Sequence, residues 1–276
     1  MSKKQKNKRL RFKQLKIYND IPKPRQVEFI ENPIPKKYVN KIFCKSSEKM
    51  NELPDCSVHL VVTSPPYNLG FEYEEQRTLS EYRDFLRSVF IEVQRVLVPG
   101  GRVCLNIVDI GLPVVLPLSS YILLDLIDLG FLYRGAIVWS KEVLSRKPMG
   151  TFQSAKNPLL RLFHEVILVF SKDTLIRLDA ENKTSEIERL EFLEWTKSVW
   201  RFPPETSKRK LHPAPFPLEL PKRCIKLFSF VNDVVLDPFC GIGTTCLAAK
   251  QLNRRYVGYD IMPKYCEIAN SLLEGG

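Results

Sequence analysis

The chain has 276 residues, 44% of them hydrophobic, which is enough to bury one substantial α/β core with at most a small accessory region. The net charge of +11 at pH 7 indicates a polyanionic partner, most simply nucleic acid. No apolar run is long enough to span a membrane, and the basic N-terminus leads into polar sequence instead of the apolar segment of a signal peptide. The composition therefore argues against a membrane-spanning or secreted protein and favours a soluble, cytoplasmic one.

Seven cysteines are scattered along the chain without a CxxC pair. An odd number with this spacing argues against a disulfide framework and against a zinc site. We therefore expect reduced intracellular thiols and no metal.

Basic residues are concentrated at the N-terminus. The eight basic residues of 1–16, with no acidic residue among them, leave a net charge of only +3 for the rest of the chain. This tail is either a solvated extension that aids solubility or an arm that contacts phosphates, and the sequence leaves both open. Its candidate phosphate contacts are Lys3, Lys4, Lys6, Lys8, Arg9 and Arg11. Four prolines in 20–38 indicate an extended segment, so we assign 1–38 to a flexible arm and 39–276 to one folded domain.

Hydrophobic periodicity predicts alternating strands and helices in that domain, and hence an α/β fold. The predicted strands are 42–43, 58–63, 102–107, 135–139, 164–170, 234–236 and one that ends at 258–260. The predicted helices are 46–53, 79–97 (stopped by Pro99-Gly100-Gly101), 116–129, 184–198, 218–228 and one that begins near 244. In the helix 184–198 we expect Ile187, Leu190, Leu193 and Trp195 to pack against the body.

The most informative stretch is VVLDPFCGIGTTCLAA at 234–249. A buried strand ends at Asp237-Pro238, and Gly241 and Gly243 allow a tight turn into a helix that starts near Thr244. Such a unit places a ligand at the carboxyl end of a parallel strand, against a helix N-terminus. Asp260 follows about 20 residues on, where a carboxylate typically binds ribose hydroxyls. Together they predict a pocket for a nucleoside-containing cofactor, although the glycines alone would equally fit a turn in any α/β protein.

Three other segments are irregular and rich in proline or basic residues. Ser64-Pro65-Pro66-Tyr67 follows a predicted strand, and its two prolines remove two N–H donors, which leaves nearby carbonyls free to face a ligand. A Pro-Pro turn that caps the strand is the alternative. The HPAPFP segment at 212–217 predicts a rigid wall, in which we expect a structural role for His212. Residues 145–161 form a basic loop that either faces nucleic acid or is simply solvated, with Arg146, Lys147, Lys156 and Arg161.

TSPPY at 63–67, HPAPFP at 212–217 and DPFCGIGTT at 237–245 resemble, in this order, the S-adenosylmethionine-dependent amino-methyltransferases of DNA. Because the catalytic loop precedes the cofactor loop, the chain is most similar to their circularly permuted β group. WSK at 139–141 and HEVILVFSK at 164–172 extend the resemblance to roughly residues 40–270. It implies a doubly wound, mostly parallel Rossmann-like sheet with a small inserted recognition region. It also implies S-adenosyl-L-methionine as cofactor and double-stranded DNA as substrate, with a homodimer and a cognate restriction endonuclease as candidate partners.

The resemblance also implies a role for each motif. Ser64, Pro65, Pro66 and Tyr67 match the catalytic loop. The matches to the cofactor site are Asp237, Pro238, Phe239, Gly241, Gly243 and Thr244 in the glycine loop, Asp260 as ribose partner, and His212, Pro213 and Phe216 in the wall beside the methionine end. Many relatives carry an acidic residue just after the first strand, where this chain has Cys44-Lys45-Ser46.

Methyl transfer to an exocyclic amine requires its delocalised lone pair to be localised. The Ser64 side chain and the Pro65 carbonyl are expected to accept hydrogen bonds from the amine, while Tyr67 stacks on a flipped-out base. In this family, enzymes with a serine at the first position of the loop mostly methylate cytosine N4, and enzymes with an aspartate or asparagine there mostly methylate adenine N6. We therefore expect a cytosine-N4 enzyme, with an adenine-N6 enzyme as the first alternative and a catalytically silent nucleic-acid-binding subunit as another. Target recognition is expected from 142–161, 173–210 and the N-terminal arm.

Overall fold

The computed structural model describes residues 19–67, 76–111, 114–141, 150–181, 183–207 and 216–275. Their strands form one eight-stranded sheet in the order β1-β8-β7-β2-β3-β5-β4-β6. The strands are β1 (Lys41–Cys44), β2 (Val58–Thr63), β3 (Leu97–Ile107), β4 (Leu132–Ser140), β5 (His164–Ser171), β6 (Val199–Arg201), β7 (Val234–Asp237) and β8 (Arg255–Asp260). The helices are η2 (Lys36–Tyr38), α2 (Leu79–Val96), α3 (Leu118–Asp128), α4 (Arg189–Trp195), α5 (Glu219–Phe228), α6 (Thr244–Gln251) and α7 (Pro263–Gly275).

Most neighbouring strands in the sheet are parallel. The strands β1, β8, β7, β2 and β3 run in one direction, and only β5 is antiparallel to its neighbours β3 and β4. The pairs Ile107↔Val166 and Ser140↔His164 place the start of β5 beside the ends of β3 and β4. We call this side of the sheet, where the parallel strands end, the carboxyl edge, and the opposite side the amino edge.

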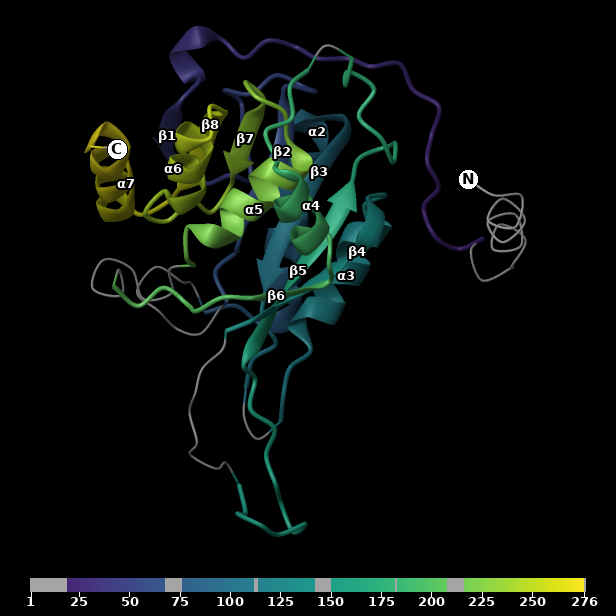
Figure 1. Cartoon of the computed structure of the whole chain (residues 1–276), viewed down its shortest axis with the longest axis vertical. Coiled ribbons are helices and arrows are strands. Elements are labelled where there is room, and N and C mark those ends of the chain that lie inside the picture. Colours follow the sequence, from purple (N-terminus) through teal and green to yellow (C-terminus); the bar gives the residue numbers. More distant parts are fainter. Residues whose placement is uncertain are drawn as a thin grey trace.

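Helices cover both faces of the sheet. In Figure 1, α4, α5 and α6 lie in front of the sheet, and α2 and α3 lie behind it. Alternate residues of β2 serve the two faces: Val61 belongs to the core shared with α2 and α3, whereas Leu60 and Val62 belong to the core shared with α5 and α6. The predicted doubly wound α/β fold is therefore confirmed.

The predicted helix over 46–53 is wrong, because these residues form turns. The side chain of Arg95, on α2, donates to the carbonyl oxygens of Met50 at 3.1 Å and Leu53 at 2.9 Å. Glu92 accepts from the backbone N–H of Met50 at 2.8 Å. These contacts use backbone groups that a helix would pair internally, and they bury Met50 and Leu53 in the core.

Two further predictions around α2 and α4 need correction. The Pro99-Gly100-Gly101 segment lies inside β3, where a Cβ on Gly100 would lie 2.1 Å from the Ile176 carbonyl oxygen, so only glycine fits. The helix predicted over 184–198 is reduced to the seven residues of α4. Trp195 is buried as expected, but Leu190 is 78% exposed and Leu193 is 54% exposed. A helix of only two turns packs the side chains of just one of its faces against the body. The edge strand β6, which follows α4, was not predicted.

The described part of the N-terminal segment lies along the body without forming a helix or strand before η2. Its backbone is attached at two points, since Arg25 donates to the Asp173 carbonyl at 2.8 Å and Asn32 donates to the Cys56 carbonyl at 2.9 Å. The side chain of Ile34 is buried in the core. Residues 25–34 therefore contact the folded body, whereas the basic residues of 1–16 lie outside the described residues.

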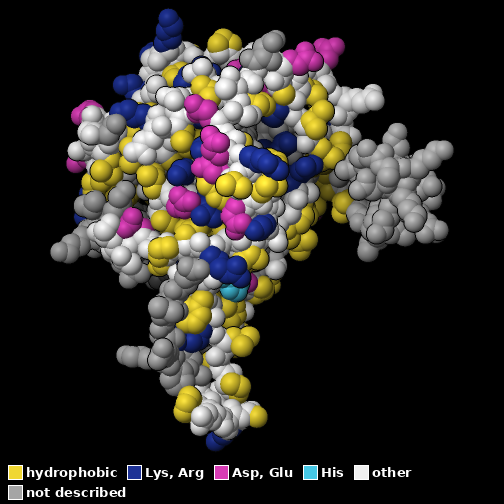
Figure 2. All heavy atoms as spheres, viewed as in Figure 1, with side chains coloured by type: hydrophobic (Ala, Val, Ile, Leu, Met, Phe, Trp, Pro, Cys, Tyr) yellow, Lys and Arg dark blue, Asp and Glu magenta, His cyan; other side chains and the backbone are white. Residues whose placement is uncertain are grey.

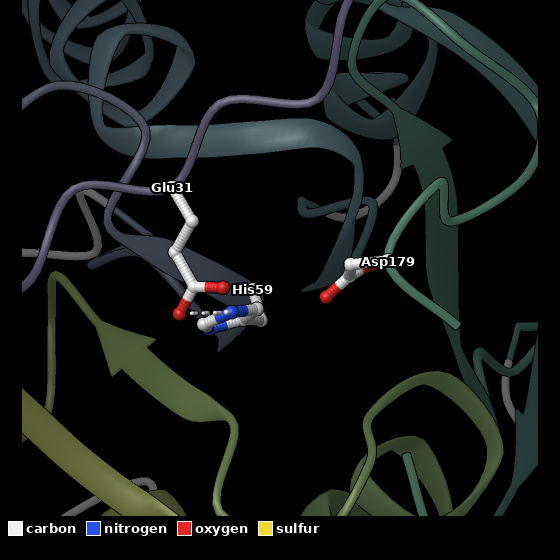
Figure 3. A group of neighbouring side chains, drawn as sticks. All are labelled: Glu31, His59 and Asp179. Atoms are coloured by element: carbon white, nitrogen blue, oxygen red, sulfur yellow. Dashed lines mark ion pairs between the residues drawn. The ribbon is translucent and has the colours of Figure 1, made fainter. Parts of the chain in front are cut away.

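A cluster of charged side chains joins this segment to the amino edge. Glu31 Oε1 lies 3.1 Å from His59 Nε2, and Asp179 lies across from them in Figure 3. Buried Asp233 accepts from Arg177 at 2.8 Å and from Lys183 at 3.0 Å. Burial alone would raise the pKa of Asp233, but the hydrogen bond and positive charge of Arg177 outweigh it and lower that pKa.

The same cluster has the spacing of a metal site, because donor atoms of Glu31, His59 and Asp179 lie within 4.8 Å of one another. However, His59 Nδ1 accepts from the Val234 N–H at 3.0 Å, so the imidazole proton sits on Nε2 and faces Glu31. Lys183 Nζ lies 2.6 Å from Asp179 and 3.8 Å from Glu31, in the position that a cation would need. We therefore assign this cluster to structural ion pairing.

All seven cysteines are free thiols, and five of them are buried. Within the described residues, none of the helices combines the length and apolar character needed to cross a membrane.

Replacing Asp233 by asparagine should destabilise the fold by about 3 kcal/mol, because it leaves Arg177 and Lys183 with an incomplete set of buried partners. Urea unfolding at neutral pH measures this loss, and Asp128→Asn, whose side chain is 70% exposed, is the control. Since the pKa of Asp233 is lowered in the folded protein, the difference from wild type should shrink as the pH falls below about 4. A neutral-pH loss no larger than that of Asp128→Asn would show that the cluster does not stabilise the fold.

Candidate active site

A cavity opens at the carboxyl edge, where the loops after β2, β7 and β8 meet. The predicted residues that line it are Ser64, Pro65, Pro66, Tyr67, Phe216, Pro238, Phe239, Gly241, Thr244 and Asp260. The structure therefore brings the TSPPY loop and the glycine loop into one cavity. Lys45 and Ser46 also line it, at the position where many relatives carry an acidic residue.

The glycine loop turns sharply between β7 and α6. Gly243 caps α6 with φ of 79°, and a Cβ there would lie 2.9 Å from the Cβ of Ala269 on α7. Glycine is needed for both the left-handed backbone and the close helix contact. The turn directs the free N–H groups at the start of α6 toward the cavity side of the sheet.

Asp260 is held by the same loop. Its Oδ2 accepts from the Gly241 N–H at 2.9 Å, and its Oδ1 accepts from the Met262 N–H at 2.9 Å. Burial raises the pKa of Asp260, and these two backbone donors oppose that rise. The carboxylate is thus fixed at the cavity wall with spare lone pairs for hydroxyl groups of a ligand.

Asp237 lies beneath the loop and links β7 to β2. Its Oδ1 accepts from the Thr63 hydroxyl at 2.6 Å and from the Phe239 N–H at 3.1 Å. Its Oδ2 is buried without a hydrogen-bond donor among the described residues. Burial raises the pKa of Asp237 to about 6. Such an oxygen is costly to bury as a charge, which is why burial favours the protonated form.

Hydrogen bonds from α2 and within the loop itself fix the TSPPY loop. The Tyr82 hydroxyl, on α2, donates to the Pro66 carbonyl at 2.7 Å, while Ser64 Oγ and the Tyr67 hydroxyl lie 2.7 Å apart. Burial raises the pKa of Tyr67 well above its ordinary value, and the charge of Glu165 adds to this effect. The phenol therefore stays protonated and can act as a hydrogen-bond donor.

Three residues outside the predicted site complete the polar surroundings of Ser64 and Tyr67. Asn106 Nδ2 donates to Glu165 Oε2 at 2.5 Å and lies 3.3 Å from the Tyr67 hydroxyl. Glu165 Oε1 pairs with Lys141 Nζ at 2.5 Å. Two sequence signals could have identified them: Asn106 is a polar residue inside an apolar strand, and Lys141 and Glu165 belong to the WSK and HEVILVFSK motifs.

The other predicted site residues do not line this cavity. Asp237 and Gly243 support its walls. His212 and Pro213 lie outside the described residues, as do Lys3, Lys4, Lys6, Lys8, Arg9, Arg11, Arg146 and Lys147. Among the candidate DNA contacts, Lys156 and Arg161 are described.

Lys156 belongs to an arm, residues 150–163, that projects far beyond the sheet on the side of the carboxyl edge (Figure 1). A bridge between Gly150 and Pro158 closes its tip. Phe152 is 67% exposed and Leu160 is 85% exposed, and Figure 2 shows hydrophobic side chains together with Lys and Arg on this projection. The arm thus exposes apolar and basic side chains on the side of the molecule where the cavity opens.

Asp237→Asn should make stability less sensitive to pH. The folded pKa of Asp237, about 6, exceeds the ordinary value of about 3.9, so the folded protein binds this proton more tightly than the unfolded chain. The contribution of Asp237 to wild-type stability should therefore fall by about 3 kcal/mol as the pH rises from about 4 to about 6, and the variant should lack this fall. Urea unfolding of both proteins across this range measures the difference, and parallel curves would contradict the burial of an ionisable Asp237.

Comparisons with known proteins agree with this geometry. A model of the DNA methylase family, which covers N6 and N4 enzymes, matches residues 58–271. The chain is 33% identical to the type II methyltransferase M.MjaI of Methanocaldococcus jannaschii over 80% of this chain and 87% of that protein. It is 30% identical to the type II methyltransferase M.BglII of Bacillus subtilis over 96% of this chain and 78% of that protein.

Solved structures share the fold. The Thermus thermophilus protein TTHA0409, in complex with S-adenosyl-L-methionine, superposes with a TM-score of 0.69 at 31% identity, over 85% of this chain and 93% of that one. The cytosine-N4-specific PvuII DNA methyltransferase superposes with a TM-score of 0.68 at 21% identity, over 90% of this chain and 98% of that one, and so shows the same fold. The chain therefore belongs to the DNA methylase family and is an amino-methyltransferase of the N4/N6 type.

Proposed function

We propose that this DNA amino-methyltransferase moves a methyl group from S-adenosyl-L-methionine to the exocyclic N4 amine of a cytosine in double-stranded DNA. The observation that carries the proposal is the placement of Ser64 and Tyr67 in the same cavity as the glycine loop and Asp260. A nucleophile held by the first pair would lie next to a nucleoside held by the second. The choice of base and the roles of the individual site residues are the parts of this proposal that experiment has to test.

The residues of the cavity fit S-adenosyl-L-methionine. The carboxylate of Asp260 suits ribose hydroxyls, and Phe216 and Phe239 supply apolar walls for the adenine and the methionine chain. TTHA0409, at 31% identity, binds this cofactor in its crystal structure.

The bound cofactor would supply an activated methyl group, so the protein has to supply position and electrostatics. In the proposed reaction, Ser64 Oγ and the Pro65 carbonyl accept hydrogen bonds from the two amine hydrogens. These contacts draw the nitrogen toward tetrahedral geometry and direct its lone pair at the methyl group. Asp260 and the glycine loop hold the donor in line.

The choice of cytosine rests on Ser64 and on the family resemblance of its loop. Family members with a serine at this position mostly methylate cytosine N4, and adenine N6 is the alternative target. A catalytically silent subunit is disfavoured, because the chain keeps both the TSPPY loop and the glycine loop in one cavity.

The target base has to leave the duplex to reach this cavity, which costs a few kcal/mol of unstacking. The projecting arm 150–163 is suited to contact DNA while the base is extruded, with Lys156 on a phosphate and Phe152 in a groove. The segment 173–210 and the N-terminal tail are further candidate contacts. A homodimer, a cognate restriction endonuclease and a cytoplasmic location are expectations that rest on resemblance and composition.

Incubating the protein with unmethylated plasmid DNA and isotopically labelled S-adenosyl-L-methionine should label N4-methylcytosine. Mass spectrometry of the digested nucleosides measures this product directly. Labelled N6-methyladenine would keep the reaction and overturn the base assignment. Cofactor binding without any label in DNA would point to a silent subunit.

In the same assay, Ser64→Ala should lower kcat by about 10²-fold to 10³-fold, since it removes an acceptor that acts on the reacting amine. Cofactor affinity should stay unchanged because Asp260 and the glycine loop are intact. Ser120→Ala, an exposed serine on α3, is the matched control. Wild-type transfer by Ser64→Ala would rule out the proposed role of this loop.

Deleting residues 1–16 should weaken DNA binding and flatten its salt dependence. The slope of log K against log salt should fall by about 0.9 for each phosphate that the tail neutralises. Fluorescence anisotropy over a range of salt concentrations measures the slope. If the truncated protein keeps the wild-type slope, the tail serves solubility only.

A further inference from the structure

Behind the TSPPY loop lies a polar cluster of Asn106, Lys141 and Glu165, none of which contacts the reacting groups in the proposed transfer. Glu165 is only 8% exposed and Asn106 1% exposed, and they come from the neighbouring strands β5 and β3. Burying the Glu165 carboxylate is costly, and its ion pair with the partly exposed Lys141 commonly gives little net stability. Because Glu165 lies beside the proposed catalytic side chains of Ser64 and Tyr67, we looked for a role of Glu165 in the reaction.

The hydrogen-bond directions in this group follow from its chemistry. Glu165 Oε1 is bound by Lys141, which leaves Oε2 to face Asn106 Nδ2 at 2.5 Å and the Tyr67 hydroxyl at 3.5 Å. The reverse orientation of the Asn106 amide would place its oxygen against the carboxylate, so Nδ2 must be the atom that faces Glu165. The same Nδ2 lies 3.3 Å from the Tyr67 hydroxyl and 3.5 Å from Ser64 Oγ.

The negative charge decides which of Ser64 and Tyr67 donates. A carboxylate accepts only, so the Tyr67 hydroxyl lowers its energy by pointing its proton at Glu165. The Tyr67 oxygen then accepts the Ser64 proton across the 2.7 Å contact. With its own proton turned inward, Ser64 Oγ presents its lone pairs to the cavity.

We propose that Glu165, positioned by Lys141 and Asn106, orients a hydrogen-bond relay from Ser64 through Tyr67. The relay makes Ser64 an acceptor for the target amine and removes the proton that the amine loses. This inference rests on the proposed role of Ser64 and gives a function to the WSK and HEVILVFSK motifs.

The proton balance of the step is simple. As the nitrogen–methyl bond forms and the sulfur–methyl bond breaks, the amine nitrogen becomes positively charged and the sulfur leaves as a neutral sulfide. The nitrogen then passes one proton to Ser64 Oγ, Ser64 passes its own to Tyr67, and Tyr67 passes its own to Glu165. Glu165 ends as a neutral carboxylic acid, and the methylated amine ends uncharged.

Glu165→Gln tests the relay, because glutamine keeps the size and one acceptor but loses the charge. We expect kcat to fall by about 10²-fold while KM for the cofactor and for DNA stays unchanged. A merely structural role would instead change KM or the unfolding temperature. An unchanged kcat, or a change confined to KM, would overturn the proposal.

Tyr67→Phe interrupts the relay at its midpoint and provides a second route to the same answer. If Glu165 acts through Tyr67, the double variant Glu165→Gln/Tyr67→Phe should have a kcat close to that of the slower single variant. Losses that multiply would show two independent effects and overturn the relay. If Glu165→Gln does not fold, Tyr67→Phe decides alone, since wild-type kcat in that variant contradicts the relay.

The matched control is Glu92→Gln, a partly buried glutamate of α2 that is paired with Arg95 at 2.8 Å and does not line the cavity. Its kcat should equal that of wild type. Comparison with Ser64→Ala distinguishes the role of the relay from the role of Ser64 itself. An inactive Ser64→Ala with a fully active Glu165→Gln removes the relay and leaves the proposed function, whereas an active Ser64→Ala removes the role of the loop itself and the relay with it.

Discussion

The site depends on the parallel pairing of β2 with β7 at the centre of the sheet. This pairing ends in the hydrogen bond between Thr63 and Asp237, which are 174 residues apart in the chain. Each strand continues directly into one of the two loops that line the cavity. Because parallel strands end at the same side of a sheet, the pairing by itself brings the TSPPY loop against the glycine loop.

The two edges of the sheet carry charges for different purposes. At the amino edge, Asp233 and its neighbours are balanced by Arg177 and Lys183 and hold the N-terminal segment on the body. At the carboxyl edge, Asp237 and Asp260 have raised pKa values because burial is not matched by cations. Buried carboxyl groups with raised pKa values and no paired cation are typical of a binding site, whereas paired charges are typical of a structural cluster.

The one antiparallel strand adds a polar element that a purely parallel sheet would not have. Because β5 runs opposite to β3, its first residues lie beside the carboxyl end of β3, and Glu165 meets Asn106 there. The projecting arm, residues 150–163, leads into β5 at the same side of the sheet (Figure 1). The proposed reaction site and the proposed DNA contact therefore lie on the same side of the molecule.

The sequence by itself determined the strands and helices around the two loops and the family, because apolar periodicity, Pro-Pro and the glycine turn are local patterns. The helix predicted at 46–53 is wrong because Arg95, from a helix distant in the sequence, donates hydrogen bonds to the backbone carbonyls there. The predicted burial of Leu190 is wrong because burial depends on which neighbouring helix covers the residue. Only the tertiary structure decided that Asn106, Lys141 and Glu165 meet behind Ser64. Their contact arises from strand direction and register, which are properties of long-range pairing that no local pattern contains.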